Sequence, residues 1–414
     1  MKAVIVGGGI IGLCSAWYLR EAGWEVELVD CSDLQDSCSY GNLGMVVPSH
    51  FVPLATPGIV AQGIRWMFDS KSPFYVKPSP SLRLISWGLK FINSARADKV
   101  DYAAPFLRDI NLLSRSLYEG WQRDGLFDFS FERKGIMMYF KEEKTAEEEY
   151  HLAEKARAMG LDVASLNREE AQAVETGTRL DVLGAVHYRC DGHLYPNQLM
   201  PALIDALRRK GVVFRLGHAV SKVHRNGRKL LSVEAGQETI PGDLFVFAAG
   251  SWLPELTAKA GVRIPLMPGK GYSFTLENPV VKLNVPAILC EARVAITPMA
   301  GRMRYGGTME LATLNETVNM QRVRGIVESV PKYFPDNQQA MPAQEAVWYG
   351  FRPCSPDGLP YIGTAKGTDN LVIGGGHAMM GLSLGPATGK LVAEIASGEK
   401  PSVAVEAFRA DRYC

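Results

Sequence analysis

Residues 2–12 read KAVIVGGGIIG and contain the pattern that decides the fold. The apolar run before the glycines predicts a strand, and residues 10–22 repeat apolar side chains at helical spacing up to Gly23. A second apolar run, residues 26–29, predicts another strand. Strand, helix and strand in this order form the βαβ unit with which a parallel sheet begins.

Three glycines in this stretch have separate roles in binding a dinucleotide. Gly7 permits a tight turn, Gly9 lets a pyrophosphate approach the backbone, and Gly12 lets the helix pack closely on the strand. The N-terminus of the helix attracts the phosphates. Asp30 ends the second strand, 23 residues after Gly7, where a carboxylate accepts hydrogen bonds from an unphosphorylated ribose. The pattern predicts FAD or NAD, held by Gly7, Gly9, Ile10, Ile11, Gly12 and Asp30.

Glycine-rich segments in the second half of the chain favour FAD over NAD. Residues 248–252 read AAGSW after a strand-like run, and residues 374–382 read GGGHAMMGL before a helix. A second glycine-rich loop and helix N-terminus are expected where a fold closes over a long cofactor. A helix N-terminus directed at the isoalloxazine ring would stabilise the anionic reduced flavin.

The 414 residues exceed what one hydrophobic core supports, so two domains are expected. Pieces of the parallel sheet recur at residues 198–216, 244–248 and 371–373, whereas the segments between them mix helix-like and strand-like patterns. The predicted fold is α/β: a Rossmann-like FAD-binding domain interleaved with an α+β substrate domain on a mostly antiparallel sheet. The FAD-binding domain is assigned to residues 1–59, 191–261 and 347–414, and the substrate domain to residues 60–190 and 262–346.

Composition narrows the class of protein. The formal net charge is +1 and no basic run stands out, so nucleic acid is not an expected partner. The seven cysteines are scattered without metal-ligand spacing, which predicts reduced thiols, a cytoplasmic protein and no metal site. Apolar segments at residues 66–68 and 84–89 leave two interpretations open, interior packing or peripheral contact with the inner face of the membrane.

Several motifs together resemble one family. They are residues 39–44 (SYGNLG), 270–273 (KGYS), 350–353 (GFRP) followed by 355–358 (SPDG), and the Gly376-His377 loop. With the glycine loop near the N-terminus, the chain resembles the FAD-dependent superfamily of D-amino acid, glycine and sarcosine oxidases over nearly its whole length. It is most similar to the small subunits of bacterial D-amino acid dehydrogenases.

The resemblance implies a second set of cofactor contacts. The loop from Ser39 to Met45 is expected under the FAD phosphates, ribityl chain and ring, Val220 on the adenine side, and Gly376 to Leu382 at the pyrimidine edge. The FAD is expected to be non-covalent, because Cys354 does not match the attachment site of sarcosine oxidases. The full set is Ser39, Asn42, Leu43, Gly44, Met45, Val220, Ala249, Gly250, Trp252, Gly376, His377, Met379, Met380, Gly381 and Leu382.

Two departures from the family pattern stand out. Ala378 occupies a position where many relatives have glycine. Residues 48–54 read PSHFVPL, in which His50 and Phe51 replace the usual small or aromatic residues. Similar Ser-His-Phe segments occur in relatives that act on D-proline or cis-4-hydroxy-D-proline, so the resemblance implies a substrate of this type.

Candidate substrate contacts follow from the chemistry of an amino acid. A carboxylate is bound best by a bidentate arginine with a hydroxyl beside it, which favours Arg352 and Tyr272. His50 is expected to contact the substrate and to shape substrate choice. The predicted activity is oxidation of a small D-amino or cyclic imino acid by hydride transfer to FAD, with a quinone or an electron-transfer chain as acceptor.

Two alternatives to this activity remain. One is an oxidase of the glycine or sarcosine type that uses O₂. The other is a flavin-binding subunit of a hetero-oligomeric electron-transfer complex. The sequence leaves the oligomeric state open, as either a homo- or a hetero-oligomer.

Overall fold

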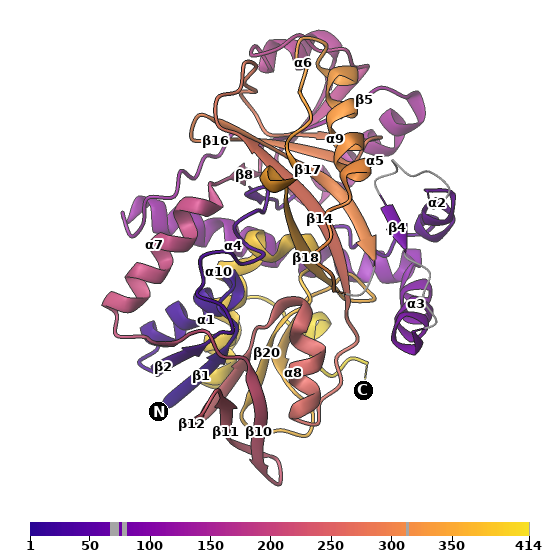
Figure 1. The fold of residues 1–414 in the computed structure, drawn as a ribbon. Coiled ribbons are helices and arrows are strands. Elements are labelled where there is room, and N and C mark those ends of the chain that lie inside the picture. Colours follow the sequence, from indigo (N-terminus) through magenta and orange to yellow (C-terminus); the bar gives the residue numbers. More distant parts are fainter. Residues whose placement is uncertain (67–73, 77–80, 312–313, 414) are drawn as a thin grey trace.

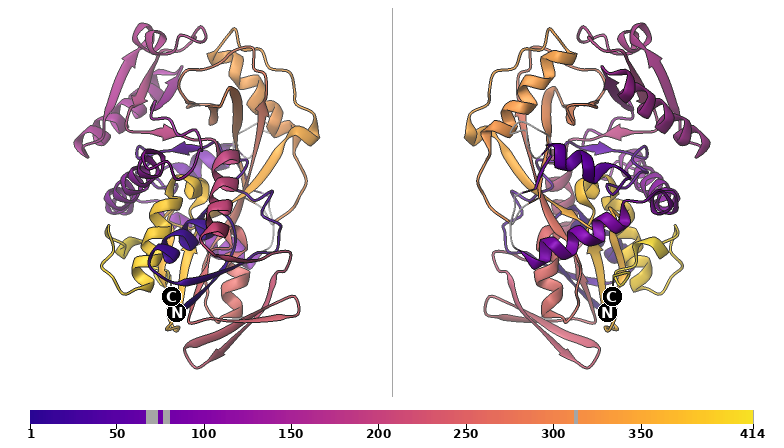
Figure 2. Two further views of the ribbon diagram at one scale, coloured as in Figure 1. Left: turned by 90° about the vertical axis from the view of Figure 1, so that its left-hand side faces the viewer. Right: turned by 90° about the vertical axis from the view of Figure 1, so that its right-hand side faces the viewer.

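The computed structural model describes residues 1–66, 74–76, 81–311 and 314–413. These residues form a six-stranded and a nine-stranded sheet, besides smaller ones. Figures 1 and 2 show the two large sheets toward opposite ends of the molecule, with helices α4 and α10 in the middle. Strands β14 and β18 extend from the larger sheet toward the smaller one (Figure 1). This arrangement matches the predicted fold class, a Rossmann-like α/β fold combined with a mostly antiparallel sheet.

The six-stranded sheet has the order β19-β20-β13-β1-β2-β9 within the described residues. Five strands are parallel and β19 is antiparallel to β20. The sheet contains every parallel strand expected from the sequence. Its strands are β1 (Lys2–Val6), β2 (Glu25–Val29), β9 (Val213–Arg215), β13 (Leu244–Phe247), β19 (Tyr361–Thr364) and β20 (Leu371–Gly375).

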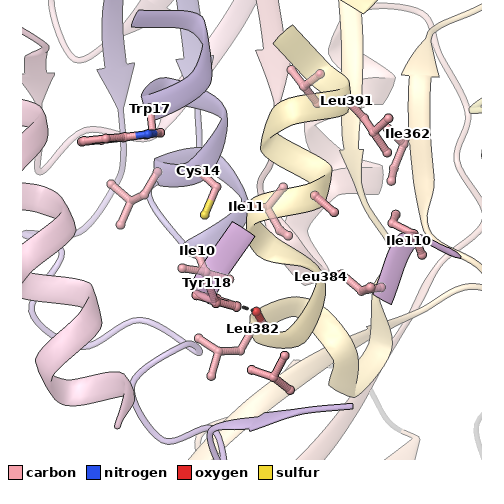
Figure 3. Packing of buried hydrophobic residues seen from close by; sticks show 14 of the residues in the cluster. Ile10, Ile11, Cys14, Trp17, Ile110, Tyr118, Ile362, Leu382, Leu384 and Leu391 are labelled. Atoms are coloured by element: carbon pink, nitrogen blue, oxygen red, sulfur yellow. Dashed lines mark hydrogen bonds between the residues drawn. The ribbon is translucent and has the colours of Figure 1, made fainter. Parts of the chain in front are cut away.

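Helices cover the smaller sheet and fill the middle of the molecule. α1 packs against α10 and α7, and α10 packs in turn against α4. Their apolar side chains form one buried cluster, part of which is drawn in Figure 3. The helices are α1 (Ile10–Glu21), α4 (Ala97–Arg123), α7 (Pro196–Arg209), α8 (Leu253–Lys259) and α10 (Gly381–Ala396).

The larger sheet has the order β18-β14-β17-β16-β15-β5-β7-β6, with β4 added beside β17, in the part of the chain that the structure describes. Only the β4–β17 and β5–β15 pairs among these are parallel. Its strands are β4 (Phe74–Val76), β5 (Ile136–Phe140), β6 (Val163–Asn167), β7 (Gly184–Tyr188), β14 (Met267–Leu276), β15 (Ala287–Leu289), β16 (Val294–Met299), β17 (Arg302–Leu311) and β18 (Trp348–Cys354).

The remaining elements are short or peripheral. The helices are α2 (Ile59–Trp66), α3 (Leu82–Ser94), α5 (Glu143–Ala158), α6 (Arg168–Val174) and α9 (Met320–Tyr333). The strands are β3 (Met45–Val46) and β8 (Gly192–His193), which pair, and the ribbon β10 (Val220–Asn226), β11 (Lys229–Ala235) and β12 (Glu238–Pro241). Single 3₁₀ turns are η1 (Gly250–Trp252), η2 (Gln344–Ala346), η3 (Ala378–Met380) and η4 (Glu406–Phe408).

The domain boundaries stay a prediction, with one observation that bears on them. β18 follows residue 347, in a segment assigned to the FAD-binding domain, yet it is hydrogen-bonded to β14 in the larger sheet. Because β18 is an edge strand, its free edge faces the FAD-binding segments: Ser251 Oγ donates to the Phe351 carbonyl (3.2 Å), and Cys38 Sγ lies 3.5 Å from the Phe351 amide.

Candidate active site

The glycine loop between β1 and α1 leaves room for a ligand at one position only. A Cβ on Gly7 would lie 2.4 Å from the Ala248 carbonyl oxygen, and one on Gly12 would lie 1.8 Å from the Gly7 oxygen. A Cβ on Gly9 would meet only the Ser39 hydroxyl, at 3.7 Å. Gly7 and Gly12 are therefore required by close packing, and Gly9 provides the open backbone that a pyrophosphate needs.

Asp30 braces this loop. One carboxylate oxygen accepts a hydrogen bond from the Gly8 amide (2.6 Å), and the other accepts from the Ser32 amide and hydroxyl (2.8 and 2.7 Å). The Asp30 carbonyl accepts from the His218 amide, so the segment that leads to the buried Val220 runs beside it. Asp30 lies at the carboxyl end of β2, where a ribose would share its oxygens.

The loop from Ser39 to Met45 is fastened at both ends. Ser39 Oγ accepts from the Ile10 amide at the start of α1 (3.1 Å). Gly44 has a φ of 69°, and a Cβ there would lie 2.0 Å from the Leu194 oxygen, so the loop passes against β8 where only glycine fits. Asn42 Oδ1 accepts from the Gly44 amide (2.9 Å) and stabilises this turn.

Arg304 holds the same loop from the larger sheet, and sequence reasoning missed it. Its Nη1 donates to the carbonyls of Tyr40 and Asn42 (both 2.7 Å), and its Nη2 donates to Asn197 Oδ1 (2.9 Å). Ser273 Oγ adds a bond to the Gly41 carbonyl (2.8 Å). Burial lowers the pKa of Arg304 to about 10. Nothing local in the sequence distinguishes Arg304 from another strand arginine.

Leu43 packs beside the larger sheet, and Met45 belongs to the two-stranded sheet of β3 and β8. Leu43 Cδ2 would lie 3.1 Å from a Cβ on Gly306 of β17, and Met45 pairs with His193 across β3 and β8. The loop thus lies between the glycine loop and the face of the larger sheet that carries Ser273.

The C-terminal glycine-rich loop contains two residues with a positive φ. Gly376 has a φ of 75°, and Ala378 has a φ of 48° although it is not glycine. His377 Nε2 lies 2.9 Å from Thr388 Oγ1, and burial lowers the pKa of His377 to about 3, so the ring is neutral. Its Nδ1 is buried without a hydrogen-bond partner among the described residues, which leaves one polar atom for a ligand.

α1 and α10 run side by side in Figure 3, with the labelled Ile10 and Leu382 toward one end and Trp17 and Leu391 toward the other. A Cβ on Gly385 would lie 2.8 Å from Ile10 Cγ1, and one on Gly389 would lie 2.4 Å from the Cys14 carbonyl carbon. α1 and α10 are therefore parallel with their first turns together, and neither first turn holds an acidic residue. Tyr118 fixes the start of α10 by donating to the Leu382 carbonyl (2.7 Å). Both helix N-termini favour negative charge at this point.

Met379, Met380 and Gly381 form the junction between loop and helix. Met379 is 40% exposed, and its carbonyl lies 3.5 Å from Asn42 Nδ2, so the C-terminal loop approaches the loop at residues 39–45. Met380 caps α10, which begins at Gly381. The two loops that sequence reasoning assigned to the flavin are thus brought together.

Residues 249–252 lie at the end of β13. Gly250 has a φ of 52° and begins η1, with Ala249 as its cap. Trp252 is 47% exposed and packs edge-on against Phe351, with ring centroids 5.9 Å apart. The indole therefore contacts the edge strand β18.

Arg352 lies on the face of the larger sheet that meets the loop at residues 39–45. Its strand pairs it with Gly269, and a Cβ on Gly271 would lie 2.1 Å from Arg352 Nη1. The Nη1 group donates to the Thr308 carbonyl (2.5 Å), and Thr308 adopts a φ of 62° that turns this carbonyl toward it. Burial lowers the pKa of Arg352. Within the described part of the chain the remaining guanidinium donors have no hydrogen-bond partner, so they can form a carboxylate fork.

Tyr272 lies on the opposite face of the sheet from Arg352. Its hydroxyl is 3.1 Å from Glu310 Oε2, and it accepts a bond from the Asn319 amide (3.3 Å). It shares that face with Lys270, whose ammonium lies 5.9 Å from the Tyr272 ring centroid. Arg352 lies over Gly271 of β14, and Tyr272 is the next residue of that strand. Because successive side chains of a strand point to opposite faces, the structure does not bring Tyr272 beside Arg352.

His50 belongs to a segment that joins the two loops to the end of β18. The Val47 amide donates to Ser383 Oγ in the first turn of α10 (3.0 Å), and Leu54 packs against the apolar cluster that contains Cys354. His50 Nδ1 lies 3.0 Å from Ser49 Oγ, which donates to Asp191 Oδ2 (2.5 Å). The sequence predicted His50 as a substrate contact, which stays a prediction, and did not indicate its bonded neighbours Ser49 and Asp191.

Cys354 is an inert, buried thiol. Its Sγ lies 3.4 Å from the Arg352 carbonyl, and a Cβ on Gly269 would lie 3.0 Å from the sulfur. Burial raises the pKa of Cys354 to about 12, which disfavours the nucleophilic thiolate. A non-covalent cofactor agrees with this environment.

Comparisons with known proteins agree with this geometry. The family described as FAD dependent oxidoreductase matches residues 2–395. A D-amino acid dehydrogenase of Rhizorhabdus wittichii is 31% identical over 100% of both chains, and one of Vibrio vulnificus (strain CMCP6) is 29% identical over 97% of each.

Solved structures share the fold. Glycine oxidase from Geobacillus kaustophilus superposes with a TM-score of 0.79 at 23% identity, covering 100% of this chain and 99% of that one. L-proline dehydrogenase from P. horikoshii superposes with a TM-score of 0.74 at 19% identity, covering 100% and 97%. A match over almost the entire chain, together with glycine loops that fit a dinucleotide, shows that this chain belongs to the FAD dependent oxidoreductase family and uses FAD.

Proposed function

We propose that this protein is a D-amino acid dehydrogenase that oxidises the carbon–nitrogen bond of a D-amino or cyclic imino acid. The observation that carries the proposal is the position of Arg352, a partly buried guanidinium on the sheet face that meets the loop at residues 39–45. Relatives named D-amino acid dehydrogenase support it, one of them 31% identical over the whole chain.

In this proposal the protein mainly binds and orients the substrate. Arg352 holds the carboxylate by two parallel hydrogen bonds, and the Thr308 carbonyl and Gly271 backbone fix the guanidinium. FAD, when bound, supplies the acceptor for a hydride from the carbon next to nitrogen. Orientation and exclusion of water then provide most of the rate enhancement. The product is an imine, which hydrolyses to a 2-oxo acid or remains as a pyrroline when the substrate is cyclic.

The experiment is anaerobic titration of the purified holoenzyme with a panel of D-amino acids that includes D-proline and cis-4-hydroxy-D-proline. Bleaching of the flavin by D-isomers and not by their L-isomers is expected. No bleaching by any member would contradict the proposal. Hydrogen peroxide formed in air would favour the glycine-oxidase alternative, and bleaching of the isolated chain would exclude a role limited to assembly of a larger complex.

If the electron acceptor is a quinone dissolved in a membrane, the protein needs a surface that contacts the membrane. Helix α3 has such a surface. Among the described residues no helix is both long and apolar enough to cross a bilayer. Trp87 of α3 is buried and donates to the Cys354 carbonyl (2.9 Å), whereas an apolar stripe faces outward: Leu82, Ile85, Leu89 and Ile92, which are 82%, 52%, 64% and 54% exposed. The other apolar segment, residues 66–68, has no described side chains.

We therefore propose that the outward stripe of α3 makes a peripheral membrane contact. An Ile85→Ser, Leu89→Ser double variant should sediment less with vesicles of phosphatidylethanolamine and phosphatidylglycerol than the unmodified protein. Leu126→Ser, at a residue 41% exposed elsewhere, is the matched control. Equal sedimentation of the double variant and the unmodified protein would contradict the contact.

A further inference from the structure

Asp191 is a fully buried carboxylate in front of β8. Its Oδ1 accepts from the Ser49 amide (2.9 Å) and lies 3.4 Å from Cys190 Sγ, and its Oδ2 accepts from Ser49 Oγ (2.5 Å). The nearest cation that influences it is Arg115, which donates to the Cys190 carbonyl (2.7 Å). Burying an ionisable group without direct pairing to a cation is costly, which calls for an explanation.

The hydrogens shared by Asp191, Ser49 and His50 can take two arrangements along these bonds. Ser49 has one hydroxyl hydrogen, so when it donates to ionised Asp191 its oxygen accepts from His50 Nδ1–H, 3.0 Å away. His50 then presents a lone pair at Nε2. When Asp191 is protonated the direction reverses: Asp191 donates to Ser49, Ser49 donates to His50 Nδ1, and His50 presents Nε2–H. Three residues thus couple a buried carboxylate to the far side of an imidazole ring.

The segment that carries His50 connects two parts of the candidate active site. Residues 45–54 run from the first turn of α10, where Ser383 accepts from the Val47 amide, to the cluster at the end of β18, where Leu54 packs. That cluster includes Cys354, two residues beyond Arg352. His50 is only partly buried although Asp191 is not exposed at all, so the ring is the accessible end of the chain of bonds.

We propose that Asp191, Ser49 and His50 form a relay that takes up the proton which the substrate nitrogen must lose before its carbon is oxidised. The inference rests on the proposed function. His50 Nε2 accepts one proton from the substrate ammonium, His50 Nδ1 passes its proton to Ser49 Oγ, and Ser49 passes its proton to Asp191 Oδ2. The substrate is left as a neutral amine and Asp191 as a neutral acid; no electrons move in this step. His50 is the catalytic residue, and Ser49 and Asp191 act through it.

The electrostatics of the site agree with this direction. Burial raises the pKa of Asp191 to about 7 and lowers the pKa of His50 to about 4, so near neutral pH the proton is held by the buried carboxyl rather than by a charged imidazole. The titratable or charged groups that face Asp191 are Cys190, Arg115 and Tyr188, and burial raises the pKa of both Cys190 and Tyr188.

The test is the pH profile of flavin reduction in single turnovers of the holoenzyme with D-proline or the best substrate of the panel. Ser49→Ala breaks the relay and should slow reduction near pH 7 by about 100-fold, within the range for general base catalysis. The rate should recover toward the unmodified value as pH approaches the amine's own pKa, about 10 for an alkylamine. Ser49→Thr keeps the hydroxyl and should restore activity near pH 7.

Ser116→Ala is the matched control, because Ser116 is an exposed serine of α4 that donates to the Leu113 carbonyl (2.7 Å) and does not contact Asp191. It should leave the profile unchanged. A loss in Ser49→Ala that is equal at every pH, or no loss near pH 7, would overturn the relay.

A second readout does not depend on substrate. Nitrogen NMR of ¹⁵N-histidine-labelled holoenzyme, with His50 assigned by its absence in His50→Asn, should show the proton on Nδ1 above the Asp191 pKa and on Nε2 below it. Ser49→Ala should abolish this exchange. A single tautomer at all pH values would overturn the relay, whereas failure of every D-amino acid to bleach the flavin would overturn the proposed function and leave the NMR result to decide the relay.

Discussion

The Arg352 guanidinium lies against the backbone of Gly271, so closely that a Cβ on Gly271 would come within 2.1 Å of Arg352 Nη1. Glycine at this point of β14 is what allows the guanidinium to lie flat over the strand and reach the Thr308 carbonyl. The position of the proposed carboxylate clamp therefore depends on a residue that never touches substrate.

Gly271→Ala should displace Arg352 and lower kcat/KM for the D-amino acid by about 10- to 100-fold, since misplacing a positioned group by about 1 Å costs up to 10². FAD content should stay unchanged, because Gly271 is not assigned to the cofactor. Gly88→Ala is the control, since a Cβ there meets nothing within 4 Å. Unchanged kcat/KM in Gly271→Ala would show that the guanidinium position is unimportant.

Tyr272→Phe should affect stability more than activity. The hydroxyl is bonded to Glu310 and Asn319 on the sheet face away from Arg352, so its loss leaves a partly buried carboxylate with one donor fewer. We expect a loss of about 1.5–3 kcal/mol in the free energy of unfolding, measured in urea, as for a hydrogen bond to a charged group. A large fall in kcat/KM without loss of stability would return Tyr272 to the carboxylate clamp.

Asp30→Ala should weaken FAD binding. The carboxylate braces the glycine loop through the Gly8 amide and lies where a ribose would donate to it. A loss of about 1.5–3 kcal/mol corresponds to a dissociation constant raised about 10- to 150-fold. Fluorescence titration of the apoprotein with FAD measures it. Asp36→Ala, at an exposed acid in the segment that follows β2, should bind FAD normally; equal constants for the two variants would contradict the role of Asp30.

Asp191 should make stability depend on pH. Its pKa is about 7 in the folded protein and about 3.9 in the unfolded chain, so the folded state holds more protons between these values. The contribution of the neutral carboxyl is therefore fully present below about pH 4 and is lost as pH rises to about 7. Asp191→Asn stays neutral, so its thermal midpoint should rise relative to the unmodified protein over this window.

The control for this measurement is Asp205→Asn, at a side chain 60% exposed. Its midpoint should track the unmodified protein at every pH. A constant difference between Asp191→Asn and the unmodified protein from about pH 4 to 7 would show that Asp191 titrates normally.

Local sequence patterns were sufficient for the parts of the fold whose causes are local. Gly7, Gly12 and Asp30 act within one βαβ unit, and each has the packing or bonding expected of it. Ala378, at a position where the resemblance implies glycine, has a φ of 48°, in the region that favours glycine.

Features that depend on register or on distant contacts could not be predicted in this way. Arg352 and Tyr272 were paired because a carboxylate is bound best by a guanidinium with a hydroxyl beside it, but only the strand pairing reveals that the two side chains lie on opposite faces of the sheet. Arg304 bonds to a loop 262 residues away, and Asp191 bonds to a serine 142 residues away. The residues next to Arg304 and Asp191 in the sequence show no pattern that would predict either contact.

The most direct test of the amino-acid assignment compares flavin reduction by a D-amino acid with reduction by the matching amine that lacks the carboxylate. The unmodified enzyme should strongly prefer the amino acid, and Arg352→Ala should lose about 2–5 kcal/mol, or roughly 30-fold to several thousand-fold in kcat/KM. Arg352→Lys should recover only part, because a point charge cannot form the planar fork. Equal rates with both compounds, or a loss below about threefold in Arg352→Ala, would contradict the account and indicate an amine oxidoreductase.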